Sequence, residues 1–145
     1  LVSPEMYKKY IQPLMKNYCD IIHQGDKLFM MHACGHVNGY LKMIYETGID
    51  AHHYLTDSPV GDTSAGQARK VWNNEITVMA AVDPFIQADG SVEDVRNNVL
   101  DILRQVQPGD NFILMSPLKP DIPEENIRII SRIMQEYDRY PLDLE

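Results

Sequence analysis

The sequence predicts an α/β fold in which four short strands alternate with helices, after one leading helix. Four apolar runs are each followed by a stretch with helical spacing, and this alternation favours a parallel sheet with helices packed against it. With 145 residues the chain suits one domain and falls short of the roughly 250 residues of a complete eight-stranded β/α barrel. We therefore predict a single unit over residues 1–145. Periodicity alone leaves a doubly wound sheet and part of a barrel as alternatives.

The leading helix is predicted to begin at Ser3-Pro4, because Ser can cap a helix and Pro is tolerated in its first turn. Apolar side chains then recur at helical spacing as far as Ile22. Pro13 should bend this helix, and Gly25-Asp26 should end it.

The strands are predicted over residues 27–31, 49–55, 75–82 and 111–115, since these short apolar runs suit the buried strands of a parallel sheet. The helices that follow them are predicted over residues 37–46, 63–72, 92–106 and 123–137. The third of these helices has the clearest start, because Ser91 and Asp94 resemble a capping box.

Composition narrows the classes of partner. The formal net charge is -8 and the basic residues are scattered, so nucleic acid is not expected as a partner. No apolar stretch reaches the length of about 20 residues that spans a membrane, and no membrane partner is expected. Two cysteines, Cys19 and Cys34, are too few for a disulfide scaffold, which favours a reducing, cytoplasmic location.

The first candidate site is the segment His32-Ala33-Cys34-Gly35, which follows the first predicted strand. Functional groups of α/β proteins collect in the loops after the C-terminal ends of strands. Imidazole and thiolate both suit zinc, and two ligands one residue apart project to the same side of an extended segment. His32 and Cys34 are therefore candidate metal ligands; the alternative is a buried cysteine beside a histidine bonded to the backbone.

The loop after the second strand also carries candidates. His52 and His53 are adjacent in a strand and must face opposite sides, so at most one of them faces the cavity at the strand ends. Asp57 and Asp62 flank a loop that contains Pro and Gly, where such residues more often form turns.

Two further loops carry polar groups. Asp83 leaves the third strand and is our candidate catalytic residue: a proton carrier, a metal ligand or a hydrogen-bond anchor, with a loop-bracing role as the alternative. After the fourth strand, Ser116 and Lys119 are polar candidates in a loop that is otherwise apolar.

Several segments together resemble the uroporphyrinogen decarboxylase superfamily in their order and spacing. They are Ser3-Pro4-Glu5-Met6-Tyr7 with Ile11-Gln12-Pro13, His32-Ala33-Cys34-Gly35, Glu46-Thr47-Gly48-Ile49-Asp50-Ala51, Val82-Asp83-Pro84, and Pro123-Glu124-Glu125-Asn126-Ile127. The resemblance runs nearly end to end. It implies the C-terminal half of a (β/α)8 TIM-type barrel.

The resemblance implies two alternative activities. One is methyl transfer from a corrinoid to a thiol or similar acceptor, with zinc held by a His-x-Cys pair, here His32 and Cys34, and by a later Cys. The loop after the last strand contains no Cys, so Asp83, Asp57 or His36 could complete such a site. The other activity is decarboxylation of uroporphyrinogen, a tetrapyrrole, without metal or cofactor; the Gly-His-Gly stretch of those enzymes is absent here.

A third possibility is a non-catalytic half barrel that binds a corrinoid or tetrapyrrole, with a corrinoid protein as a possible partner. A half barrel exposes two strand edges and one sheet face. We therefore expect the chain to pair with the missing half or with itself, and to be inactive alone even where the full-length parent is an enzyme.

Overall fold

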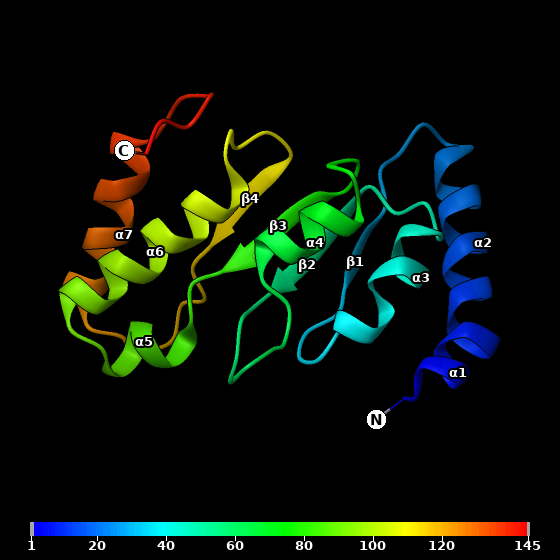
Figure 1. Cartoon of the computed structure of the whole chain (residues 1–145), viewed down its shortest axis with the longest axis horizontal. Coiled ribbons are helices and arrows are strands. Elements are labelled where there is room, and N and C mark those ends of the chain that lie inside the picture. The colour runs from blue at the N-terminus through cyan, green and yellow to red at the C-terminus, as the bar shows by residue number, and fades with distance from the viewer. Residues whose placement is uncertain (1, 145) are drawn as a thin grey trace.

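The computed structural model describes residues 2–144, which form one sheet and the helices around it (Figure 1). The strands are β1 (Met30–His32), β2 (Ala51–Leu55), β3 (Thr77–Ala81) and β4 (Phe112–Met115). The helical segments are α1 (Pro4–Met6), η1 (Tyr7–Ile11), α2 (Gln12–His23), η2 (Asn38–Tyr40), α3 (Leu41–Tyr45), α4 (Ala65–Val71), α5 (Pro84–Asp89), α6 (Val92–Val106) and α7 (Glu124–Glu136).

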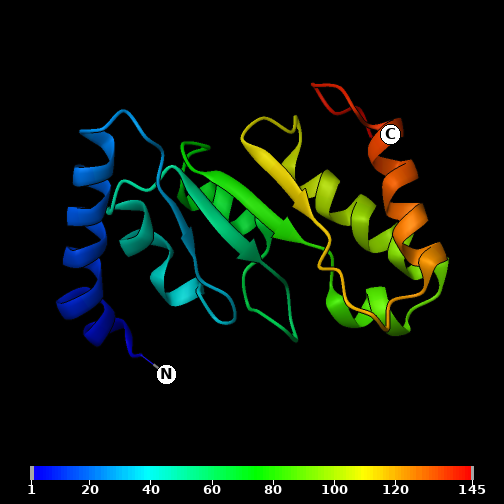
Figure 2. The same cartoon turned by 180° about the vertical axis from the view of Figure 1, so that it is seen from behind.

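The sheet topology separates the two alternatives that periodicity left open. All neighbouring strands pair in parallel, and their order β1-β2-β3-β4 follows the sequence. A doubly wound sheet reverses its strand order at a switch point and carries helices on both faces. Here α4 and α6 cover one face, and the view from behind shows the strands uncovered (Figure 2). The predicted partial barrel is therefore confirmed.

The two faces of the sheet differ in burial. The face under the helices carries a row that the strand register aligns, and its members are buried: Met31, His52, Val78 and Phe112. The next row, His32, His53, Met79 and Ile113, projects from the opposite face and is exposed or half-buried. We call this second surface the open face; in a closed barrel it would line the interior.

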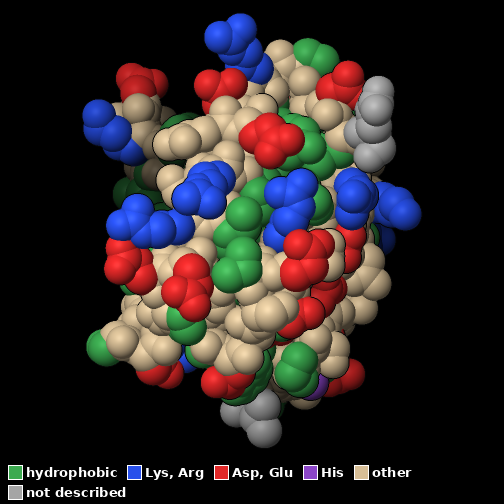
Figure 3. Space-filling model, turned by 90° about the vertical axis from the view of Figure 1, so that its left-hand side faces the viewer, with side chains coloured by type: hydrophobic (Ala, Val, Ile, Leu, Met, Phe, Trp, Pro, Cys, Tyr) green, Lys and Arg blue, Asp and Glu red, His purple; other side chains and the backbone are tan. Residues whose placement is uncertain are grey.

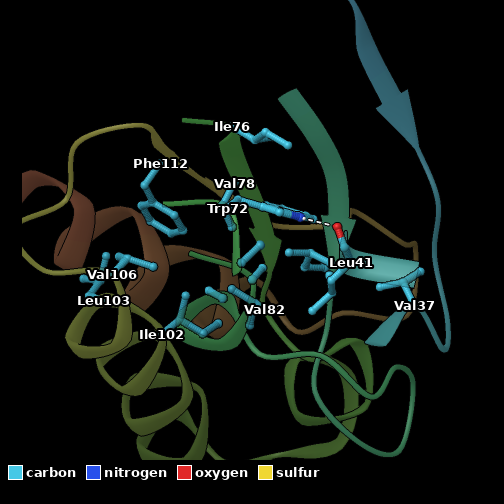
Figure 4. Packing of buried hydrophobic residues seen from close by; sticks show 14 of the residues in the cluster. Val37, Leu41, Trp72, Ile76, Val78, Val82, Ile102, Leu103, Val106 and Phe112 are labelled. Carbon is cyan, nitrogen blue, oxygen red and sulfur yellow. Dashed lines mark hydrogen bonds between the residues drawn. The ribbon is translucent and has the colours of Figure 1, made fainter. Parts of the chain in front are cut away.

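The core lies between the sheet and the helices (Figure 4). Trp72, which directly follows α4, is fully buried, and its Nε1 donates a hydrogen bond of 2.8 Å to the carbonyl oxygen of Leu41. Val99 and Leu103 of α6 are also fully buried. This packing fixes α4 and α6 on the sheet and so fixes the strand ends where the candidate site lies.

The leading helix is confirmed, with an irregular turn. The Ser3 side chain accepts a hydrogen bond from the Met6 backbone N–H, as the predicted cap requires. A π-helical turn, η1, precedes the first turn of α2, where Pro13 lies. Pro has no backbone N–H, and a wider turn before it accommodates that missing donor.

Two predicted boundaries are wrong. Strand β1 is displaced toward the C-terminus of the predicted 27–31 run and ends at His32. The segment after β3, predicted as a loop, contains the short helix α5. Pro84 occupies its first turn and Asp83 its cap, which are ordinary helix-start signals that a six-residue helix is too short to reveal through periodicity.

The surface at the α7 end carries both signs of charge (Figure 3). Ion pairs join Arg104 to Asp101 within α6 and Arg128 to Glu124 within α7. Among residues 2–144, no helix is both long enough and apolar enough to cross a membrane.

Candidate functional site

His32 is the last residue of β1, whereas we expected it in the loop that follows this strand. Its side chain is exposed and lies on the open face, because its buried neighbour Met31 projects toward the helices. The C-terminal end of β1 therefore presents an imidazole to the side that a closed barrel would use for chemistry.

A second imidazole meets it from the neighbouring strand. His53 pairs with His32 in the register of β1 and β2, and the two Nδ1 atoms lie 2.6 Å apart. The ring centroids are 4.8 Å apart. The expectation that only one of the adjacent histidines faces this side is confirmed, since His52 is fully buried under the helices.

Burial favours the neutral form of two of these imidazoles, those of His52 and His53. Burial lowers the pKa of His53, and the proximity of His32 lowers it further. On the other face, burial lowers the pKa of His52 to about 4, with smaller contributions from His32 and His53. Neutral imidazole is the form that binds metal ions.

Tyr54 belongs to the same cluster and was missed by the sequence analysis. Its backbone has a φ of 77°, which is rare for an aromatic residue, and the strand register shifts between His53 and Leu55. This bulge lets consecutive residues project to one side, so the Tyr54 ring lies 6.0 Å from the rings of both His32 and His53. No sequence signal distinguishes such a bulge from a regular strand.

Cys34 is exposed and unpaired, two residues beyond the end of β1. Gly35 follows with a φ of 83°, a left-handed conformation that favours glycine. Cys34 also borders a pocket of about 530 Å³ between this loop and the leading helix. The other walls of the pocket are mostly apolar, including Tyr7, Ile11, Val37, Tyr40 and Ile44.

The structure does not test the metal site predicted from His32 and Cys34, and the one contact at this place joins His32 to His53. Within residues 2–144, no three His, Cys, Asp or Glu side chains converge closely enough to hold a metal ion. The donors present at this rim, two imidazoles and one thiol, have the chemistry that zinc prefers. The residues therefore fit zinc in kind, and two of the donor atoms already meet.

Asp83 has a structural partner. Its Oδ1 accepts hydrogen bonds from the backbone N–H groups of Phe85 and Ile86, at 2.8 and 3.1 Å, and so caps α5. Burial raises the pKa of Tyr54, and the charges of Cys34 and Asp83 raise it further.

The other polar candidates serve neighbouring segments. Asp62 Oδ1 accepts hydrogen bonds from the backbone N–H groups of Val37 and Asn38, where the helix after β1 begins. Ser116 Oγ accepts a hydrogen bond of 2.7 Å from Gln87 Nε2 of α5. No hydrogen bond or ion pair brings Lys119, which is exposed, to the site among the described residues.

A comparison with known proteins identifies the family of this chain. The family model described as uroporphyrinogen decarboxylase (URO-D) matches residues 1–137, nearly the whole chain. The chain belongs to the URO-D family. The resemblance inferred from its motifs is thereby confirmed.

A solved structure supports the fold of this URO-D half barrel. A methyltransferase from Methanosarcina mazei superposes with a TM-score of 0.73 at 17% sequence identity. The match covers 96% of this chain and 39% of that one, as expected for part of a barrel. At this identity the likeness establishes the fold alone. No curated protein matches the sequence.

Proposed function

We propose that this chain is the metal-binding half of a URO-D family methyltransferase that moves a methyl group to a thiol or similar acceptor. The observation that carries the proposal is the pair His32 and Cys34, both exposed at the C-terminal end of β1. Barrel enzymes place their chemistry at this end of the strands.

His32 and Cys34 are the residues we assign to zinc. A bound zinc ion would lower the pKa of an acceptor thiol and keep it as the thiolate nucleophile. The backbone orients both side chains. The register of β1 and β2 fixes the position of His32, and the left-handed turn at Gly35 sets the direction of the segment that carries Cys34.

The pocket beside Cys34 suggests where an acceptor would lie. Its walls are mostly apolar, and the tilted rings of Tyr7 and Tyr40 lie 5.1 Å apart between centroids; they suit the uncharged carbon skeleton of a small thiol. Lys and Arg are absent from the described lining, which disfavours an acceptor held by an anionic group.

The methyl donor rests on the family resemblance, and the role of Asp83 rests on its place directly after β3. The methyl donor would be a corrinoid, free or carried by a corrinoid protein. Asp83 remains our candidate proton carrier, because the α5 cap uses Oδ1 and leaves Oδ2 for another partner.

The open face implies a further partner for the site. Met30 and Ile113 are exposed on this face. Strands β1 and β4 are the two edge strands of the sheet, and each pairs on one side only among residues 2–144. We expect a complementary half barrel, or a second copy of this chain, to cover this face and to supply the rest of the substrate site.

Metal content is the direct test on the chain itself. We expect elemental analysis after zinc incubation and gel filtration to find about one zinc per chain, with a loss of zinc in His32→Ala and Cys34→Ser. Cys19→Ser is the matched control, because Cys19 is the other free cysteine and is buried away from the site. Protein that remains metal-free after incubation would remove the basis of the proposal.

The reaction needs a complete barrel in which this chain is the C-terminal half. We expect this barrel to transfer the methyl group of methylcobalamin to an uncharged alkyl thiol. Mass spectrometry would detect the thioether product. Uroporphyrinogen, offered to the same barrel, should remain unchanged. Decarboxylation without added zinc would instead assign the protein to the other activity of the family.

A further inference from the structure

The leading helical segment, from α1 through η1 to α2, carries an apolar stripe that remains exposed. We call it the outer stripe, and its five members are each between 48% and 56% exposed: Met6, Tyr10, Leu14, Tyr18 and Ile21. Figure 1 and Figure 2 show α2 as the outermost element at one end of the molecule. A contiguous row of large exposed apolar side chains marks an interaction surface.

The outer stripe is separate from the face that holds this segment on the core. Tyr7 and Cys19 are buried, and Ile11 and Met15 pack against the core cluster. Each of these four residues directly follows a member of the outer stripe, so the stripe lies about 100° around the helix from the core. A surface helix is ordinarily polar outside its core-facing side. This segment therefore has two apolar faces, and the core covers one of them.

The π-helical turn η1 keeps the outer stripe straight. From Met6 to Tyr18 its members are four residues apart, and in an α-helix such a step overshoots a full turn by about 40°. The wider turn of η1 offsets this drift between Met6 and Leu14. The outer stripe therefore runs along one side of the helix for roughly 22 Å, a length along which a second helix can pack.

We propose that the outer stripe is the contact surface of a homodimer, in which the leading helices of two copies pack antiparallel about Leu14. The stripe is self-complementary under this two-fold symmetry. Leu14 meets Leu14 of the partner subunit, and Tyr10 faces Tyr18 of the partner subunit on both sides of the axis. This interface goes beyond the proposed function and does not depend on it.

The charges beside the outer stripe favour this partner and this orientation. Lys9 and Asp20 are exposed, each directly precedes a stripe residue, and neither forms an ion pair among residues 2–144. Both therefore lie on the flank away from the core. Antiparallel packing about Leu14 brings Lys9 close to Asp20 of the partner subunit, twice by symmetry. A parallel pair would hold these two charges roughly 16 Å apart along the helices.

Sedimentation equilibrium of the 145-residue chain is the first test, and we expect a mass that rises toward a dimer with concentration. Leu14→Glu should weaken the dimer by at least about tenfold, because the two-fold axis brings two carboxylates together. Phe85→Ser is the matched control and should leave the dimer unchanged, because Phe85 is 59% exposed but lies on α5, away from α2 (Figure 1). Circular dichroism verifies that both variants are folded.

Charge reversal tests the orientation. Lys9→Glu and Asp20→Lys each place like charges opposite one another at two symmetric positions, and each should weaken the dimer by about two- to tenfold. The double variant Lys9→Glu/Asp20→Lys restores opposite charges and should recover most of the wild-type affinity. A double variant that does not recover would overturn the antiparallel arrangement.

A disulfide at the two-fold axis gives a second readout. A Cys34→Ser background removes the exposed thiol of the wild type. In this background Leu14→Cys places two thiols within the reach of a disulfide, and oxidised glutathione should convert the chain into a covalent dimer. Phe85→Cys in the same background should give no covalent dimer.

The outcomes separate this interface from the other surfaces of the molecule. A wild-type chain that stays monomeric at every concentration would overturn the inference, and so would a dimer that Leu14→Glu leaves intact. A monomer that cosediments with neutral phospholipid vesicles would assign the outer stripe to a lipid surface instead. None of these readouts uses zinc or methyl transfer, so failure here is distinguishable from failure of the proposed function.

Discussion

His52 and His53 are neighbours in β2, yet the fold gives them opposite environments. His52 lies under the helices, its ring 5.4 Å from that of Trp72, and neither ring nitrogen has a hydrogen-bond partner among the described residues. His53 lies on the open face with its Nδ1 against that of His32. Because strand side chains alternate, one residue of displacement separates a buried core imidazole from an imidazole on the open face.

This difference shows how the two faces divide their roles. The helix side supplies the buried apolar area that stabilises the unit, and an unpartnered imidazole there lowers stability. The open face contributes little burial, so its side chains are free to bind a metal ion or substrate. The same division applies along the other strands.

The sharpest test of this division uses two adjacent residues of β4. Phe112 is 7% exposed on the helix side, and Ile113 is 47% exposed on the open face. We expect Phe112→Ala to reduce the free energy of unfolding by about 3–5 kcal/mol, because it opens a cavity in the core. Ile113→Ala should cost about 1 kcal/mol or less. Urea denaturation followed by circular dichroism measures both.

A large loss in the free energy of unfolding for Ile113→Ala would contradict the difference between the two faces, since it would mean that the open face is covered in solution. Light scattering of the Leu14→Glu variant, in which the outer stripe is blocked, distinguishes the reason across a range of concentrations. A mass that rises toward a dimer would identify a second copy of this chain as the cover, and a constant monomer mass would exclude it.

The second test concerns pH. Burial lowers the pKa of His52 to about 4 from an ordinary 6.5, so the folded protein binds fewer protons than the unfolded chain between these values. The stability is therefore complete above about pH 6.5 and is lost as the pH falls through this window, by about 3 kcal/mol in total.

His52→Leu should remove most of this loss, and it should also relieve the two unpartnered nitrogens at neutral pH. His53→Leu is the matched control on the open face and should retain most of the pH dependence. Unfolding midpoints in urea near pH 7.5 and near pH 4.5 provide the measurement. Equal pH dependence in wild type and His52→Leu would show that other groups cause the acid sensitivity.

Much of the helix side could be predicted from the sequence. The apolar spacing in α6 and the capping box at Ser91 and Asp94 locate that helix correctly, because local interactions determine them. The opposite orientation of His52 and His53 follows from strand geometry alone. The family motifs then distinguish a half barrel from a doubly wound sheet, a choice that local periodicity cannot make.

The site was less predictable, because long-range register and irregular backbone form it. His53 meets His32 only through the pairing of β1 with β2, 21 residues apart in the chain. Tyr54 joins them through a bulge with a positive φ, which propensity does not foresee for an aromatic residue. The cap formed by Asp83 went unnoticed because α5 is short.

The smallest expected effect concerns Asp83, where structure and chemistry compete for one side chain. If its main role is to cap α5, Asp83→Ala should lower the free energy of unfolding by about 1 kcal/mol, because the N–H groups of Phe85 and Ile86 lose their acceptor. Asp83→Asn keeps a capping oxygen and should cost at most a few tenths of a kcal/mol. In the completed barrel, a loss of methyl transfer in the stable Asp83→Asn variant would assign a proton-transfer role to the carboxylate. Full activity in Asp83→Asn would leave Asp83 on the structural side of the comparison, with His52.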